Sequence, residues 1–290
     1  MILSFAPSAG SGALALGLAL LAMLSYALAA WPSAEGRQLP AWALGFAWLL
    51  HLLLLVLDIG GWGRSEAGAR LGFGPVLSLT VWLVLGVHTI ESRLVPLPAV
   101  RRVLATMGAA VVLLGWAFPG EMRPALSAWA PLHWLLGVAS YALFGAAVLH
   151  GTMLDAAERR LRAHGGRAGV ASAAASAAAG AAAVSAHGPM GLPLLRLERL
   201  TFRFVEAGFA VLTLALALGL ATSPARRWDH KAVFSLLAWA VFAALLAGRA
   251  WRGWRGRRAT RWLYAGALLL LLAYVGSRFV FEVLLGRPAA

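Results

Sequence analysis

Residues 130–151 read APLHWLLGVASYALFGAAVLHG, a stretch without a single Asp, Glu, Lys or Arg. A helix needs about 20 consecutive apolar residues to cross the hydrocarbon core of a bilayer, and this stretch is long enough. A histidine and a tryptophan, His133 and Trp134, stand near its start. The stretch therefore predicts a membrane-spanning helix that carries an imidazole at one end.

The rest of the chain shares this apolar character. Of its 290 residues, 61% are hydrophobic and only 12% are charged, about half the charged fraction of an average soluble domain. Because backbone polar groups cannot stay unsatisfied in lipid, helices are the expected form of the apolar stretches. We predict an all-α fold, a polytopic transmembrane helical bundle of about eight spanning helices, at residues 11–31, 41–59, 73–91, 102–119, 129–150, 204–222, 231–249 and 262–285.

The net charge of +14 is carried largely by the loops that follow the first, third, fifth and seventh predicted spans. Loops on the cytoplasmic side of membrane proteins are enriched in Lys and Arg. The sequence therefore predicts that both termini face away from the cytoplasm (N-out/C-out) in a bacterial inner (plasma) membrane. Since topology accounts for the basic charge, a nucleic-acid partner is not expected.

Three regions are predicted along the chain. Residues 1–150 hold helices one to five, residues 151–203 form a cytoplasmic low-complexity linker and interfacial lead-in, and residues 204–290 hold helices six to eight. The linker contains AGVASAAASAAAGAAAVSAHGP, which is rich in Ala, Ser and Gly and has no patterned apolar face. The lead-in, LPLLRLERLTFRFVEAGF, alternates apolar and charged residues, which is typical of a segment at the membrane surface.

Two histidines fall at the same predicted depth. His133 lies at the outer end of the fifth span and His230 at the outer start of the seventh. A bis-imidazole iron site needs one such ligand on each face of the porphyrin, and the nearby Trp134 and Trp228 could cover its ring. The structural alternative is that the tryptophans mark the membrane interface and that His230 is an exposed residue at a helix start. Spacing alone favours this alternative.

Two further ionisable side chains stand within predicted spans. His51 lies in the middle of the second span, seven residues before Asp58 on the same helix face. It is expected to be either a neutral imidazole bonded to a neighbouring helix or a second haem ligand or proton relay. Arg278, in the eighth span, is placed to pair with Glu282 four residues later; the other interpretation is that it meets a haem propionate.

Catalytic signatures are missing from the sequence. It contains no HExxH motif, no phosphate-binding loop and no serine–histidine–aspartate order, so binding rather than catalysis is expected. It also contains no cysteine, which excludes disulfides, thiolate ligands and thioether attachment to this chain. His88 and His150, near the inner ends of the third and fifth spans, are expected either to lie at the interface or to form an inner ligand pair.

Three stretches carry a family resemblance: PLHWLLGVASYALFGAAVLHG, LLRLERLTFRFVEAGFAVLTLALALG, and the long segment from DHKAVF at residue 229 to VLLG at residue 286. They resemble the cytochrome c assembly membrane family that includes CcsA and CcmC, in its HemX/YpjD-like branch. The resemblance implies a haem-handling membrane protein with haem as cofactor and other cytochrome c assembly proteins as partners. It also implies two outward-facing histidine ligands, which correspond to His133 and His230.

The tryptophan-rich signature of that family, of the WGxxWxWD kind, is absent from this sequence. Two other functions therefore stay open. One is a transporter or transporter accessory subunit, in which His51, Asp58 and Arg278 would line a polar path. The other is a regulatory scaffold linked to tetrapyrrole synthesis, whose basic loops would bind a soluble partner.

Overall fold

The computed structural model describes residues 9–32, 39–59, 68–92, 98–124, 128–171, 194–222 and 230–280. Eight of its helices are long and apolar enough to cross a membrane, which confirms the predicted helical bundle. The helices are α1 (Ala9–Ala30), α2 (Leu39–Ile59), α3 (Phe73–Ser92), α4 (Pro98–Ala117), α5 (Ala130–Ala171), α7 (Leu194–Thr222), α8 (His230–Arg252) and α9 (Gly256–Leu271). The last helix continues through a π-helical segment, η2 (Leu272–Gly276), into the short α10 (Ser277–Phe279).

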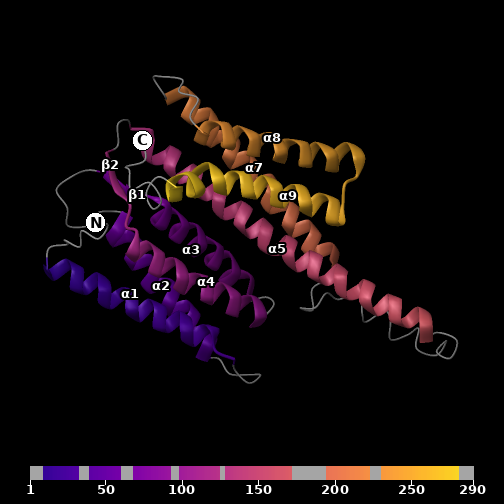
Figure 1. Cartoon of the computed structure of the whole chain (residues 1–290), viewed down its shortest axis with the longest axis horizontal. Coiled ribbons are helices and arrows are strands. Elements are labelled where there is room, and N and C mark those ends of the chain that lie inside the picture. The colour runs from indigo at the N-terminus through magenta and orange to yellow at the C-terminus, as the bar shows by residue number, and fades with distance from the viewer. Residues whose placement is uncertain are drawn as a thin grey trace.

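The helices form two groups that meet along α3 and α5 (Figure 1). In the first group, α1 to α4 pack around a core that includes Tyr26, Leu85 and Leu104. In the second, α5, α7, α8 and α9 pack around Phe144 and Phe242, whose rings stack with centroids 3.8 Å apart. Each group thus has its own apolar core.

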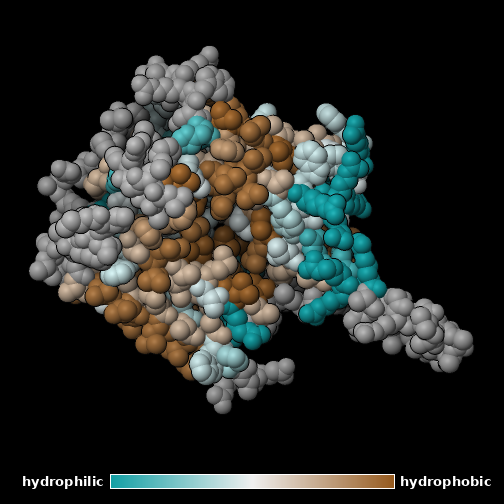
Figure 2. Space-filling model, viewed as in Figure 1, coloured by the Kyte–Doolittle hydropathy of each residue, from teal (hydrophilic) through white to brown (hydrophobic). Residues whose placement is uncertain are grey.

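The outer surface of the bundle is as apolar as its interior. Figure 2 shows a broad hydrophobic surface that ends at a hydrophilic zone on the right of the view. Large apolar side chains such as Leu24, Leu135 and Leu214 are more than half exposed. Side chains of this kind are stable in contact with lipid tails rather than with water, so this surface is the part of the protein that the bilayer covers.

Successive spans run in opposite directions, so their ends gather in two places. The starts of α3, α5 and α8 lie at one end, which we call the His133 end. The start of α7, the end of α8 and the start of α9 lie at the other, which we call the arginine-rich end after Arg196, Arg199, Arg252 and Arg257. Figure 1 shows the turn between α8 and α9 on the right and the two strands on the left.

Two helices are longer than their apolar stretches predict. The fifth span was expected to end at residue 150, but α5 continues to Ala171, and α7 begins at Leu194 rather than at residue 204. Hydropathy marks the length that lies in lipid, whereas the helix itself continues wherever its backbone stays hydrogen-bonded. Most of the predicted low-complexity linker, residues 172–189, lies outside the described residues.

A small antiparallel sheet was not predicted. Strand β1 (Gly68–Leu71) precedes α3 and β2 (Glu121–Pro124) precedes α5, and the two pair in the register Gly68 with Pro124 and Leu71 with Glu121. The sheet joins the connection after α2 to the connection after α4 at the His133 end. It thereby fixes the place from which α5 enters the bundle.

Candidate functional site

His133 occupies the first turn of α5 and is half-buried against α7. Its Nδ1 atom lies 3.1 Å from the backbone carbonyl oxygen of Ala215. A carbonyl can only accept, so Nδ1 carries the proton, and in the neutral imidazole the lone pair is then on Nε2. This is the tautomer that metal-ligating histidines commonly adopt when a backbone carbonyl orients the ring.

A glycine makes room for this imidazole. Gly219 stands four residues after Ala215 on α7, and a Cβ atom built there would lie 2.9 Å from Cε1 of His133. Any larger residue at 219 would therefore press on the ring. The carbonyl of Ala215 and the missing side chain of Gly219 together place the His133 ring against α7. Nothing in the sequence pattern singled out either residue.

Trp134 and Tyr274 lie in a small apolar core at the same end. Both pack against a buried cluster formed by Leu71, Val76 and Val138. Trp134 is half-buried there, so the indole is part of the packing between α3, α5 and η2. Its predicted role in covering a porphyrin stays a prediction.

Arg278 is fully buried beside that core. Its guanidinium carbon lies 5.6 Å from the centroid of the Tyr274 ring, a distance at which a cation and an aromatic face attract each other. Glu282, the ion-pair partner expected from the sequence, lies outside the described residues. A buried arginine at one end of a membrane bundle is costly and is usually retained for function.

The π-helical segment just before Arg278 begins beside a tyrosine of α5. The Tyr141 hydroxyl of α5 donates a hydrogen bond to the carbonyl oxygen of Leu270, and the backbone of Tyr274 also bonds to this tyrosine. Leu270 and Tyr274 are four residues apart and would bond to each other in a regular α-helix. The phenol thus contacts the helix backbone directly before the π-helical turn, a kind of position at which side-chain insertion accompanies wider turns.

His230 is the first residue of α8 and is exposed. It lies at the same end of the bundle as His133, since α5 and α8 both start there. The two residues before it, including Trp228, fall outside the described residues. The two histidines thus lie at the same end of the bundle, and their depth in the membrane and joint ligation of an iron stay predictions.

His51 is buried and bonded on both sides. Its Nδ1 lies 3.0 Å from the Tyr26 hydroxyl of α1, and its Nε2 lies 2.7 Å from Oγ of Ser78 on α3. These contacts correspond to the imidazole bonded to neighbouring helices, the first of the two alternatives left open by the sequence. Since both ring nitrogens are engaged, an iron would have to displace one of these hydroxyls.

The three residues proposed for a polar path have separate surroundings. Asp58 accepts a hydrogen bond from Arg70 on β1 at 3.3 Å, His51 bonds to α1 and α3, and Arg278 lies beside Tyr274. In the described part of the chain, the hydrogen bonds of His51 and the ion pair of Asp58 involve different residues. The geometry therefore gives the transporter hypothesis no specific support.

The inner histidines meet near the arginine-rich end. His150 places Nδ1 2.8 Å from the Ala146 carbonyl oxygen and Nε2 3.1 Å from a carboxylate oxygen of Glu91. His88 is buried and close enough to interact electrostatically with both His150 and Glu91. The group joins α3 to α5. Among the described residues, no three His, Asp or Glu side chains are arranged to hold a metal ion.

Residues 71–285 match the family model described as cytochrome c assembly protein. Inner membrane protein YpjD of Escherichia coli strain K12 is 41% identical over 95 residues, which cover 32% of this chain and 36% of that protein. The match thus spans little more than a third of the length of YpjD.

Two longer matches are more distant. The cytochrome c biogenesis protein CcsA of Synechococcus sp. strain WH7803 is 26% identical over 91% of this chain and 90% of its own length. The protein of the same name from Parasynechococcus marenigrum strain WH8102 is 27% identical over 91% of each chain. No solved structure matches this chain.

Proposed function

This chain belongs to the cytochrome c assembly protein family, and from that membership we propose that it binds haem for the assembly of c-type cytochromes. Family membership itself supports a role in c-type cytochrome biogenesis, and the eight apolar helices and the likeness to YpjD make it a multi-pass protein of the inner membrane. Because the chain has no cysteine, its hold on haem is non-covalent, through iron ligation and packing.

The residues that would hold the haem iron are His133 and His230, at the His133 end. The observation that carries the proposal is the bond from His133 Nδ1 to the Ala215 carbonyl oxygen, at 3.1 Å. This bond orients the ring and leaves the Nε2 lone pair for iron, as in other metal sites with a backbone second partner. The exposed position of His230 at the start of α8 would leave this side chain accessible to haem.

The residues around this pair have distinct proposed parts. Trp228, two residues before His230, and Trp134, next to His133, are proposed to contact the porphyrin ring. The cationic Arg278 is proposed to attract a propionate group, since guanidinium and carboxylate pair strongly in a partly dry site. His51 is left out of the site, because both of its ring nitrogens are hydrogen-bonded to protein hydroxyls. Bound haem would supply the iron porphyrin that c-type cytochromes carry.

We also propose that the His133 end faces away from the cytoplasm, with both chain termini on that side. The basic loops at the opposite end support this orientation through the positive-inside rule. The natural chain has no cysteine, so single cysteines at Ala130 and Arg252 report the two sides separately. A membrane-impermeant maleimide added to intact spheroplasts is expected to label A130C and not R252C. The reverse pattern would contradict the orientation.

Absorption spectroscopy tests the haem site. Wild-type protein purified in detergent and titrated with haem is expected to give a Soret band and the sharp visible bands of a six-coordinate iron. H133A and H230A are each expected to weaken binding and shift the spectrum to a five-coordinate form, and the double variant to lose it. H164A/H187A is the matched control. It also removes two histidines, but from the predicted linker and lead-in, residues 151–203, rather than from the proposed haem site.

The outcomes separate the site from the function. An unchanged spectrum in H133A/H230A would place the ligands elsewhere and overturn the assigned pair. Failure of the folded wild-type protein to bind haem at all would overturn the proposed function itself.

A further inference from the structure

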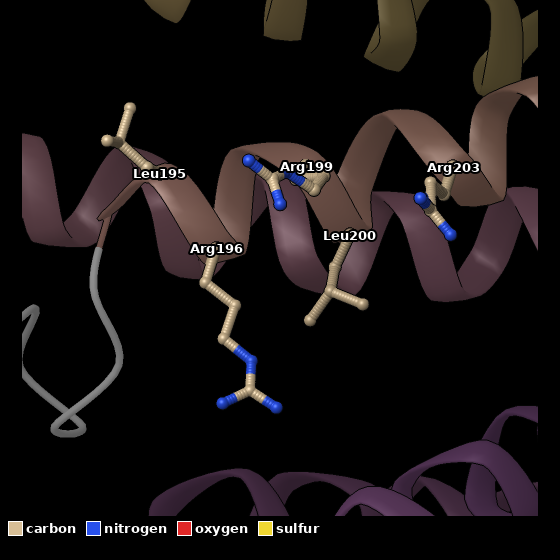
Figure 3. Close-up of a pocket in the computed structure, with 5 residues that line it drawn as sticks. All are labelled: Leu195, Arg196, Arg199, Leu200 and Arg203. Atoms are coloured by element: carbon tan, nitrogen blue, oxygen red, sulfur yellow. The ribbon is translucent and has the colours of Figure 1, made fainter.

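A hollow of about 480 Å³ opens on the first three turns of α7, at the arginine-rich end (Figure 3). It is lined by Leu195, Arg196, Arg199, Leu200 and Arg203. Figure 3 shows all five side chains on the same segment of helix, with the guanidinium groups spread along it. The hollow is therefore a strongly basic site with an apolar component, distant from the His133 end.

The three arginines form a ladder on one side of the helix. They are spaced three and four residues apart, which brings side chains to neighbouring positions on a helix surface. A run of three cations this close repels itself unless an anion lies among them. The spacing is thus unfavourable in the absence of a negatively charged partner.

The carboxylate of Glu198, which lies on the same turns of α7, already pairs with arginines outside the hollow. Glu198 accepts a hydrogen bond from Arg249 at 3.0 Å and also lies 3.8 Å from Nε of Arg255. Within the described part of the chain, Arg196, Arg199 and Arg203 make no hydrogen bond or ion pair. The hollow therefore presents three arginines, none of which forms an ion pair with an acidic side chain of the described residues.

The depth of the ladder matches the lipid headgroups. α7 has 29 residues, of which about 20 suffice to cross the hydrocarbon core. Counted from Thr222 at the His133 end, the core ends near Arg203, and the preceding turns lie beyond it. Seven residues of helix from Arg203 back to Arg196 rise about 10 Å, similar to the headgroup layer on one side of a bilayer, about 5–8 Å.

We propose that this hollow binds the phosphate headgroup of an anionic phospholipid. The planar guanidinium group forms paired hydrogen bonds with phosphate oxygens, which a compact ammonium group does not. Leu200, one turn before Arg203, is the lining residue closest to the acyl chains, while the arginines hold the headgroup. A zwitterionic lipid is bound less well, because its own cation meets the same arginines.

Native mass spectrometry of the full-length protein in a neutral detergent tests this site. The protein is titrated with phosphatidylglycerol and, separately, with phosphatidylcholine of the same acyl chains. We expect tight retention of phosphatidylglycerol by the wild type and a loss of about fivefold in affinity per arginine removed. The R196Q/R199Q/R203Q variant is thus expected to bind phosphatidylglycerol roughly a hundredfold more weakly.

The matched control is R252Q/R257Q/R261Q. These three exposed arginines lie at the same end of the bundle, on α8 and α9, so the control loses the same charge from a different surface. We expect a change of less than about twofold in this variant, because the surface charge is spread over many other basic residues. Should R196Q/R199Q/R203Q not fold, the single R199Q variant gives the same test with a roughly fivefold change.

Three results would overturn the proposal. The first is equal phosphatidylglycerol binding by the wild type and R196Q/R199Q/R203Q. The second is an equal loss of phosphatidylglycerol affinity in the control R252Q/R257Q/R261Q, which would show that the lipid responds only to the total positive charge of this end. The third is displacement of bound lipid by millimolar inorganic phosphate, which would assign the hollow to a soluble anion. The proposal is independent of haem binding, and no haem is needed in the experiment.

Discussion

Gly219 lies directly against the imidazole of His133, so that a Cβ atom at residue 219 would stand 2.9 Å from Cε1 of the ring. The contact explains why a helix rich in leucine and alanine has a glycine at this position. It also joins two helices at the point where the proposed iron ligand is oriented. The absence of a side chain at residue 219 therefore leaves the His133 ring room to reach the Ala215 carbonyl.

G219A is expected to push the ring away from α7 and to lengthen its bond to the Ala215 carbonyl. Loss of an orienting partner typically reduces metal affinity by about 10-fold or more, so haem affinity should fall by this amount with little change in thermal unfolding. The matched control is G45A, because a Cβ at Gly45 meets nothing within 4 Å. Equal haem titrations for both variants would contradict the prediction.

A second prediction concerns the carboxylate of Asp155, which accepts hydrogen bonds from the hydroxyls of Thr260 and Tyr264, each at 2.9 Å. T260V is expected to destabilise the protein by about 1.5–3 kcal/mol, because a hydrogen bond to a charged group is lost. T201V is the control, since Thr201 is equally buried but bonds only to Leu197 in its own helix. Equilibrium unfolding in mixed micelles measures the free energy of unfolding of both variants. An equal loss of stability in T260V and T201V would contradict the stabilising role of the bond to Asp155.

A third prediction is a measurable coupling between His51 and Ser78, which join α2 to α3 through a 2.7 Å contact. Double-mutant cycles in membrane proteins give about 0.6 kcal/mol on average and at most about 1.7 kcal/mol. The cycle H51L, S78A and H51L/S78A should fall in that range. The cycle with S140A in place of S78A should give no coupling, since Ser140 is buried but bonds to Gly137 in its own helix.

A fourth prediction follows from Tyr141, whose hydroxyl is inserted between Leu270 and Tyr274. Y141F removes the hydroxyl and leaves both backbone groups without this partner. Hydrogen–deuterium exchange should therefore become faster in the segment 270–277. Y264F is the control, because the Tyr264 hydroxyl donates to the carboxylate of Asp155 on α5 rather than to the backbone of residues 270–277, so its loss should leave that segment protected.

The positions of the spans could be predicted because lipid imposes a minimum apolar length. Counting spans also placed His133 and His230 at the same end of the bundle. The ends of α5 and α7 could not be predicted, because charged residues end the apolar pattern without ending the helix. The four-residue strands β1 and β2 contain too little pattern to be recognised, and their pairing depends on which connections meet at one end.

The contacts of the candidate site could not be predicted from the sequence, for a different reason. The carbonyl of Ala215 bonds to His133 across 82 residues, and every residue has a carbonyl, so no residue type marks it. The sequence left His51 open between two roles, and only its neighbours Tyr26 and Ser78 decide which hydrogen bonds it makes. The hydrogen bond from the Tyr141 hydroxyl to Leu270, just before the wide turn, likewise joins residues 129 positions apart.

Helix α5 is long enough to connect the two faces of the membrane as one continuous element. Its 42 residues make a rod of about 63 Å, roughly twice the hydrocarbon thickness, and Figure 1 shows its far part projecting beyond the other helices. A tilt of about 10° around the turn that carries His133 would displace Ala171 by about 10 Å. A small adjustment on one side of the bilayer is thus converted into a displacement of molecular size on the other.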